Sequence, residues 1–313
     1  MTTLTGAEPA ARPADPETPR RPGRRWTRDS IETLALRVLR WVVIALLVLA
    51  SVLPFYYMLM LSVRSIQDLL LDPGRIWVDP AKISLDAYRR VLRSVADGGQ
   101  GFLTLIRNSL LVSVGTVIIT LAASIPGAYA ISRLAFRGRR QVSALFVGVY
   151  FFPSIIVAVP LFVLFARLGL RGSLFGLALV YVAHTIPVTI YMLRGYFDTI
   201  PVSLEEAALL DGCGRLGVIR RVSLPLAMPA VMATGLYVCM IAWNEFLFAL
   251  LFLVQDRDRW TVSLGLAQLS GSIEVPTTVL MAGSVVLTIP IIALFFASER
   301  LLVEGLSAGA EKG

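Results

Sequence analysis

Six long apolar stretches, separated by shorter polar segments, dominate the chain from residue 41 onward. A helix needs about 20 apolar residues to cross the hydrocarbon core of a bilayer. The stretches that meet this requirement are Trp41 to Val63, Ser109 to Ser132, Val142 to Ala166, Gly172 to Leu193, Leu226 to Val254, and Val275 to Ser298. The pattern therefore predicts an all-α polytopic membrane protein with six transmembrane helices.

Every one of these stretches contains at least one proline. The prolines in question are Pro54, Pro126, Pro153, Pro160, Pro187, Pro229 and Pro290. Inside a soluble helix a proline removes a backbone hydrogen bond, whereas in a membrane bundle the neighbouring helices can satisfy the freed carbonyl. We therefore expect kinked helices arranged around a pathway.

Composition and charge agree with a membrane location. Of the 313 residues, 56% are hydrophobic and 16% are charged, and the mean hydropathy is +0.74. The net charge of +8 would also suit a nucleic-acid-binding protein. The basic residues lie between the apolar stretches, however, which indicates contact with lipid headgroups and not with nucleic acid.

Cysteine and histidine, the residues typical of transition-metal sites, are scarce. The two cysteines, Cys213 and Cys239, lie in different kinds of segment, so we expect neither a disulfide framework nor a cysteine-based metal site. The single histidine, His184, lies in an apolar stretch, where a hydrogen bond within the helix bundle is favoured over metal or ligand binding. We therefore expect no metal site in this chain.

The distribution of basic residues predicts the orientation. If the N-terminus is cytoplasmic, 18 of the 29 lysines and arginines fall on the cytoplasmic side and 11 on the outside. An excess of basic residues marks the cytoplasmic side, so both termini should be cytoplasmic. We expect residues 1–37 to form a disordered cytoplasmic tail, residues 38–303 the transmembrane domain, and residues 304–313 a cytoplasmic C-terminal tail.

The first external connection, Arg64 to Arg107, is the longest polar segment between two spans. The run Ser84-Leu85-Asp86-Ala87 can start a short helix that continues through Leu92, which would make this connection a partly ordered cap. A solvated loop with one amphipathic turn is an equally good interpretation.

The connection between the fourth and fifth spans carries stronger local signals. Pro201 ends the preceding element, and Ser203 followed by Glu206 forms a capping box that predicts a new helix. Ala207 and Ala208 would give this helix a narrow face, and Gly212 would end it in the left-handed conformation. From these residues alone, a coupling element and an ordinary surface helix are equally good interpretations.

The same segment resembles a known signature. Glu206-Ala207-Ala208, Gly212, and then Val222-Ser223-Leu224-Pro225 resemble the EAA signature of permease subunits in binding-protein-dependent ABC importers. Asp211 and the run Pro225 to Pro229 resemble the carbohydrate branch, specifically its smaller, maltose-type permease. Further similar segments are Leu85 to Tyr88, Asn108 to Leu110, Ala128 to Ala130 with Arg133 and Gly138, Pro160-Leu161, Trp243 to Phe246, and Gly305 to Gly313. Val222 and Cys213 depart from the usual residues.

The resemblance implies a type I ABC importer permease fold and a mechanism. A second, homologous permease would complete the pathway, two ABC ATPase subunits would bind beneath it and use ATP and Mg, and an extracytoplasmic solute-binding protein would deliver the solute. The coupling loop would be residues 195–229 in a bacterial inner membrane protein. The residues implied to contact the ATPase subunits are Ser203, Glu206, Ala207, Ala208, Asp211 and Gly212 in the loop, and Gly305 and Gly309 in the C-terminal tail.

The chain itself offers no ATPase site. Its only lysines are Lys82 and Lys312, and neither follows the glycine pattern of a phosphate-binding loop. We therefore expect no catalytic residues and no cofactor bound by this chain.

The triplet Trp243-Asn244-Glu245 is the second candidate site. Glu245 is the one acid inside the six apolar stretches, and such residues usually face the bundle interior or a water-filled cavity. An amide and an aromatic ring beside it suit a sugar pathway. A structural hydrogen bond between subunits is an equally good interpretation.

We therefore expect an importer permease for a sugar, with a glycerol-phosphate or polyol importer as the alternative. A stand-alone secondary carrier would carry ionisable residues in several spans, and Glu245 is the single example here. A membrane enzyme would need a convergent set of catalytic groups, which the sequence does not contain.

Overall fold

The computed structural model describes the backbone of residues 28–310 and the side chains of residues 32–298. Within this range every regular element is a helix. The chain divides between Pro54 and Phe55 into two units, and the first of them contains most of helix α1 (Arg28–Ser62). Because α1 begins at Arg28, the prediction of a disordered tail through residue 37 is wrong for its last part; the rest of that tail lies outside the described residues.

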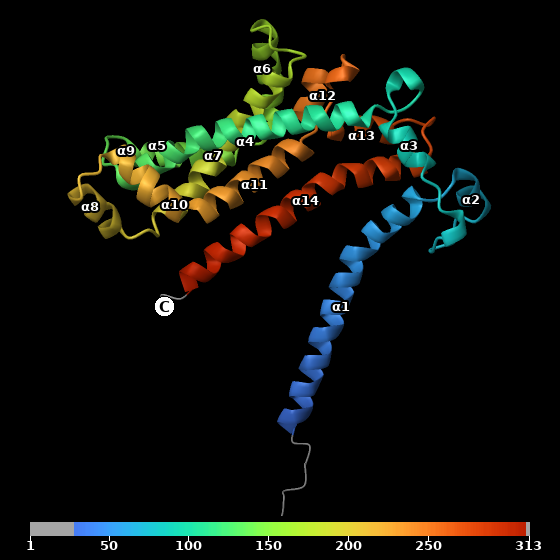
Figure 1. Cartoon of the computed structure of the whole chain (residues 1–313), viewed down its shortest axis with the longest axis horizontal. Coiled ribbons are helices and arrows are strands. Elements are labelled where there is room, and N and C mark those ends of the chain that lie inside the picture. Colours follow the sequence, from blue (N-terminus) through green and yellow to red (C-terminus); the bar gives the residue numbers. More distant parts are fainter. Residues whose placement is uncertain (1–27, 311–313) are drawn as a thin grey trace, which may run out of the picture. The chain divides into compact units, whose positions relative to one another are not determined.

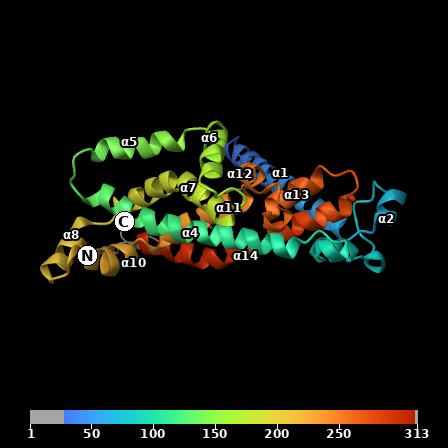
Figure 2. The ribbon, with the colours of Figure 1, turned by 90° about the horizontal axis from the view of Figure 1, so that it is seen from above.

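The second unit is built around four helices that pack side by side (Figures 1 and 2). They are α4 (Phe102–Arg133), α7 (Leu174–Phe197), α11 (Met228–Asn244) and α14 (Thr277–Ala310). Helix α4 packs against α7 and α11, and α11 packs against α14. Each of α4, α7 and α14 contains a proline in its interior. A membrane helix tolerates such a proline because neighbouring helices can satisfy the carbonyl that loses its backbone hydrogen bond.

Four described helices are long and apolar enough to cross a membrane by themselves. Two further spans require bent pairs. Helices α5 (Arg139–Tyr150) and α6 (Ser154–Arg167) meet at 97°, and the segment Arg215–Leu226 meets α11 at 76°. The six-span prediction therefore holds when each bent pair counts as one span. The sequence pattern did not reveal the bend between α5 and α6 because hydrophobicity continues through it, whereas the other bend lies where a segment with three arginines meets the start of the predicted fifth span.

The predicted third and fifth spans are not continuous helices. The third is interrupted between Tyr150 and Ser154, where Pro153 takes an extended conformation. The fifth is interrupted at Glu245, which is also extended, and continues as α12 (Leu247–Leu253). Each interruption exposes backbone groups of two helix ends inside an apolar stretch, so each needs hydrogen-bonding partners from the same chain.

The connection between the first two predicted spans is ordered, which favours the partly ordered cap over the solvated loop. It contains α2 (Ile66–Leu71), a turn at Pro80–Lys82, α3 (Asp86–Leu92) and a turn at Val95–Asp97. Helix α3, which we predicted from the sequence, buries Ala87 and Val91 against α4, α13 (Val262–Ser270) and α14. The prediction of a short helix here is confirmed.

Arg64 organises the remainder of this connection. It is 2% exposed, its Nε donates to Asp68 Oδ2 at 3.0 Å, and its other nitrogens donate to the carbonyls of Asp68, Asp72 and Arg75. Partial burial alone would raise the pKa of Asp68, but the hydrogen bond and charge of Arg64, together with Lys82, hold that pKa below its ordinary value. A single buried guanidinium thus satisfies the carbonyls of a short helix that has few apolar contacts.

Candidate functional site

The segment that resembles the EAA signature forms a short helix at one end of the four-helix bundle. Helix α8 (Val202–Leu210) lies there with α9 (Arg215–Val218) and α10 (Leu224–Leu226), and α3 lies at the other end (Figure 1). The predicted helix exists, but it begins earlier than the capping box requires. Its N-cap is Pro201, which is extended and makes no side-chain cap, so the predicted Ser203/Glu206 capping box is wrong. Ser203 already lies in the first helical turn, where its hydroxyl cannot act as an N-cap.

The end of α8 agrees with the sequence. Gly212 has φ +85°, the left-handed conformation that L side chains rarely adopt. Its N–H donates to the Leu209 carbonyl at 3.1 Å, and the N–H of Cys213 donates to the Ala208 carbonyl at 3.0 Å. These two bonds satisfy carbonyls at the end of the helix, and they turn the chain back toward the bundle.

The exposed side of α8 is largely apolar. Leu204 and Leu209 are each 46% exposed, Leu210 is 90% exposed, and Glu206 and Ala207 are exposed beside them. One side chain of α8 is buried, and it is the carboxylate of Glu205. A helix that buries one of its two acids and exposes its leucines is suited to receive a partner surface.

Glu205 accepts hydrogen bonds from three side chains of the surrounding segments. Arg133 Nε donates to Oε1 at 3.0 Å, Ser223 Oγ donates to Oε1 at 3.0 Å, and Tyr129 OH donates to Oε2 at 3.1 Å. Arg133 also donates from Nη2 to the Ile200 carbonyl at 2.6 Å. We call Tyr129, Arg133, Glu205 and Ser223 the Glu205 cluster.

The Glu205 cluster does not follow from the sequence pattern. The pattern points to Glu206 as the helix-starting residue, and Tyr129 and Arg133 stand out only through the family resemblance. The available signal was the pair of adjacent acids, of which a helix can bury only one against a given surface. The pairing itself joins residues 72 or more positions apart, except for the local bond to Ser223. No periodic pattern reports such a contact.

The second candidate site, Trp243-Asn244-Glu245, lies at the break between α11 and α12. Trp243 is buried and donates from Nε1 to the Leu287 carbonyl at 3.1 Å. Asn244 is exposed and donates to the Met240 carbonyl of its own helix at 2.9 Å. The three side chains therefore have different surroundings: Trp243 is buried, Glu245 is partly buried and Asn244 is exposed.

The Glu245 carboxylate accepts hydrogen bonds from backbone N–H groups at the start of α12. Its Oε1 accepts from the N–H of Phe248 at 2.9 Å, and its Oε2 accepts from the N–H of Ala249 at 3.2 Å and from Tyr181 OH at 2.6 Å. A helix that begins inside an apolar span leaves N–H groups that neither lipid nor water can satisfy. The carboxylate supplies the missing acceptors, in the manner of an N-cap.

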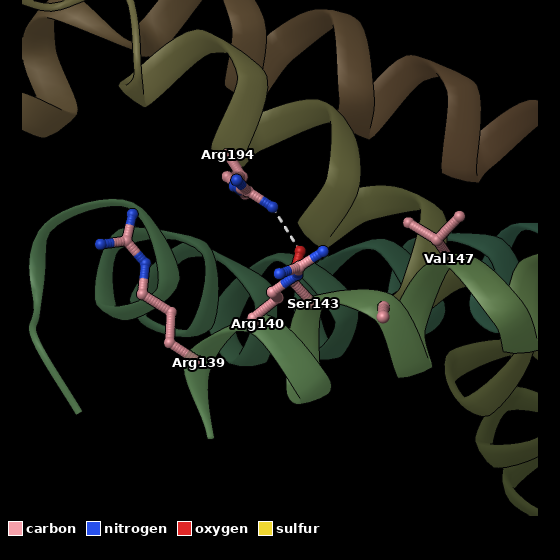
Figure 3. Close-up of a pocket in the computed structure, with 6 residues that line it drawn as sticks. Arg139, Arg140, Ser143, Val147 and Arg194 are labelled. Carbon is pink, nitrogen blue, oxygen red and sulfur yellow. Dashed lines mark hydrogen bonds between the residues drawn. The ribbon is translucent and has the colours of Figure 1, made fainter. Parts of the chain in front are cut away.

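Two cavities lie next to each other along α5 and share Ala144 in their linings. One, of about 580 Å³, is lined by Arg139, Arg140, Ser143 and Arg194, and Figure 3 shows the hydrogen bond from Arg194 to Ser143. Arg139 additionally donates to the Ser132 carbonyl at 2.9 Å. Two of the three arginines are thus engaged by the chain itself.

The other cavity, of about 740 Å³, is bounded by α5, α6, α7 and α12 and is mainly apolar. His184 lines it, is exposed, and makes no hydrogen bond to the described residues. The prediction that His184 hydrogen-bonds within the bundle is therefore wrong, because its position on α7 faces the open side of this cavity. Among the described residues, no group of three or more metal-binding side chains gathers at one place.

The predicted C-terminal tail continues a helix. The backbone of α14 extends through Ala310, so Gly305 and Gly309 both lie within it. The side-chain surroundings of the predicted tail lie outside the described residues.

Comparison with known proteins gives consistent matches. A family model described as "Binding-protein-dependent transport system inner membrane component" matches residues 115–307. The inner membrane ABC transporter permease protein YcjP of Escherichia coli is 36% identical over 86% of this chain and 94% of its own length. The trehalose/maltose transport system permease protein MalG of Thermococcus litoralis is 34% identical over 90% of this chain and 99% of its own.

A third relative and a solved structure agree with these. The trehalose transport system permease protein SugB of Mycobacterium tuberculosis is 33% identical over 89% of this chain and 99% of its own. A chain from the crystal structure of a bacterial ABC transporter, involved in the import of the acidic polysaccharide alginate, matches with a TM-score of 0.74 and 24% identity. That match covers 88% of this chain and 98% of the other.

Proposed function

Since this chain belongs to the family of binding-protein-dependent transport system inner membrane components, we propose that it forms half of the pathway for a sugar and is driven through α8 by separate ATPase subunits. The observation that carries the coupling role is the geometry of α8. The helix lies at one end of the bundle, turns its carboxylate inward and presents Leu204, Leu209 and Leu210 outward. A short, anchored helix with an apolar outer face suits a cleft on another subunit.

The partners follow from the family. A second homologous permease would complete the pathway, two ABC ATPase subunits would bind at the α8 end and supply the chemistry of ATP and Mg, and an extracytoplasmic binding protein would deliver the solute. The names of two relatives specify trehalose, or trehalose and maltose, as their cargo. This supports a sugar as the solute of this chain. The break at Asn244 is the point where we place solute contact, because its amide is exposed beside an interrupted span.

The coupling role predicts the effect of two substitutions outside the spans. Ala207→Trp places a bulky ring on the exposed side of α8 and should block docking on the ATPase. Gly212→Val forces an L side chain into the left-handed conformation, at a cost of roughly 1–2 kcal/mol, and should misdirect the helix. Both variants should reach the membrane at normal levels and lose uptake of labelled trehalose and maltose by about tenfold or more.

Matched controls come from the external connection. Ala96→Trp adds the same ring at an exposed position, and Gly98→Val carries the same backbone penalty at φ +76°, with no atom within 4 Å of the new Cβ. Both should transport normally. Normal uptake by Ala207→Trp and Gly212→Val, with ATPase subunits still co-purifying, would refute the coupling role.

A further inference from the structure

We infer that Glu205 is a positioning residue that makes α8 a rigid extension of α4, so that a displacement of α8 is passed to the membrane span and not absorbed in the loop. This inference rests on the proposed coupling function. It concerns the internal face of α8, where Glu205 is buried against its own chain.

The attachment of α8 to the bundle depends on few contacts. The helix packs against α9 and the adjoining segment Ile219–Ser223, both of which belong to the same loop. Its link to α4 passes through the Glu205 side chain, which reaches Tyr129 and Arg133 in the last two turns of that helix. Without this carboxylate, α8 would be joined to the spans chiefly through the return segment, whose Ile219 and Leu224 pack against the ends of the spans.

The Glu205 cluster also reaches α7. The ring of Tyr129 lies edge-on to that of Phe197, at the end of α7, with centroids 5.8 Å apart. Arg133 holds the Ile200 carbonyl in the linker between α7 and α8. One carboxylate is therefore bonded to groups that secure the ends of two adjacent spans, and these spans pack along their lengths.

Burial makes the geometry specific. The side chains of Glu205 and Arg133 are 6% and 10% exposed, so water competes little with their ion pair. A buried charge without its partner is strongly unfavourable, and this penalises any arrangement in which α8 swings away from α4. An exposed ion pair at the same place would impose little such restraint.

Rigidity can be measured directly with two spin labels in the full chain. Leu210→Cys on α8 and Ile119→Cys on α4 are both exposed positions for nitroxides, in a background with Cys213→Ser and Cys239→Ala. We expect one narrow distance distribution, which Glu205→Gln and Arg133→Gln should each broaden. The neighbouring exposed residues provide matched controls, because Glu206→Gln and Arg137→Gln should leave the distribution narrow.

A double variant distinguishes a specific interaction between Glu205 and Arg133 from two independent destabilising effects. If Glu205 and Arg133 act on each other, Glu205→Gln combined with Arg133→Gln should be no worse than the more severe single variant, because no charge is then left unpaired. Independent effects would instead add.

The functional readout is ATP hydrolysis by the complex together with its uptake of labelled trehalose and maltose. Glu205→Gln should retain membrane level and bound ATPase subunits, while sugar transported per ATP falls by roughly tenfold. An unchanged distance distribution would overturn the inference, as would loss of the ATPase subunits from the complex, which would assign Glu205 to docking or folding. Failure of the proposed function would appear elsewhere, as normal transport by Ala207→Trp and Gly212→Val.

Discussion

At the scale of residues, three acidic side chains occupy places that demand a partner. Glu205 lies in the first turn of α8 at one end of the bundle, Glu245 lies at the break between α11 and α12, and Asp68 lies beside the buried Arg64. Each is satisfied within its own chain, by an arginine or by backbone N–H groups. Their substitutions should therefore have effects that differ in kind from those of exposed acids.

Glu245 provides the first prediction. Glu245→Ala removes the acceptors for the N–H groups of Phe248 and Ala249 and should lower stability by about 1–2 kcal/mol, seen as a lower melting temperature of the purified permease complex. Glu245→Gln keeps one acceptor oxygen and should be milder. Asn244→Ala, at the exposed neighbour, should keep the melting temperature but reduce sugar uptake. Equal melting temperatures for Glu245→Ala and Asn244→Ala would contradict the capping role.

Asp68 provides the second prediction. Asp68→Asn leaves the buried Arg64 without its carboxylate and should make the connection between residues 64 and 107 more sensitive to proteolysis, whereas Glu274→Gln, at an exposed acid, should not.

Because the pKa of Asp68 is lowered in the folded state, its stabilising contribution is present above the ordinary value of 3.8 and is lost as pH falls through the lowered value. Protease sensitivity of the native chain should therefore stay constant from neutral pH down to about 5. A steep increase near pH 6 would show that another group controls the segment.

At the scale of elements, two breaks within predicted spans lie beside the larger cavity. The break between α5 and α6, and that between α11 and α12, lie inside stretches that the hydrophobic pattern presents as continuous. Both adjoin the larger cavity, which α5, α6 and α12 line with α7. Interrupted spans in a membrane are tolerated where irregular backbone is buried in protein or lines a cavity. The breaks and the cavity therefore belong together.

At the scale of the whole molecule, topology tests whether the bent pair of α5 and α6 is one span. With reporters inserted near Arg137 and after Lys312, we expect cytoplasmic signals, and with one near Gly98 an external signal. The decisive insertion is at Gly169, after α6: an external signal means that α5 and α6 together cross the membrane. A cytoplasmic signal there would make the pair a re-entrant loop and reduce the number of spans.

Much of the architecture follows from the sequence alone, because it depends on local composition. Length and hydrophobicity predict where the chain enters lipid, since a span must match the bilayer thickness. Glycine at position 212 predicts the turn after α8, since few other residues adopt φ +85°. The family resemblance likewise rests on residues close together in the chain, and the comparisons confirm it.

Tertiary structure decided which side each polar group faces. Glu205 and Glu206 are adjacent and chemically alike, yet the first is buried against Tyr129 and Arg133 and the second is exposed. The difference arises from the position of α8 against the end of α4, a contact across more than 70 residues. Likewise, Glu245 caps α12 because the span breaks there, and hydrophobicity does not distinguish a broken span from a continuous one. Local patterns specify which segments are helices, whereas the pairing of buried charges depends on how those helices pack.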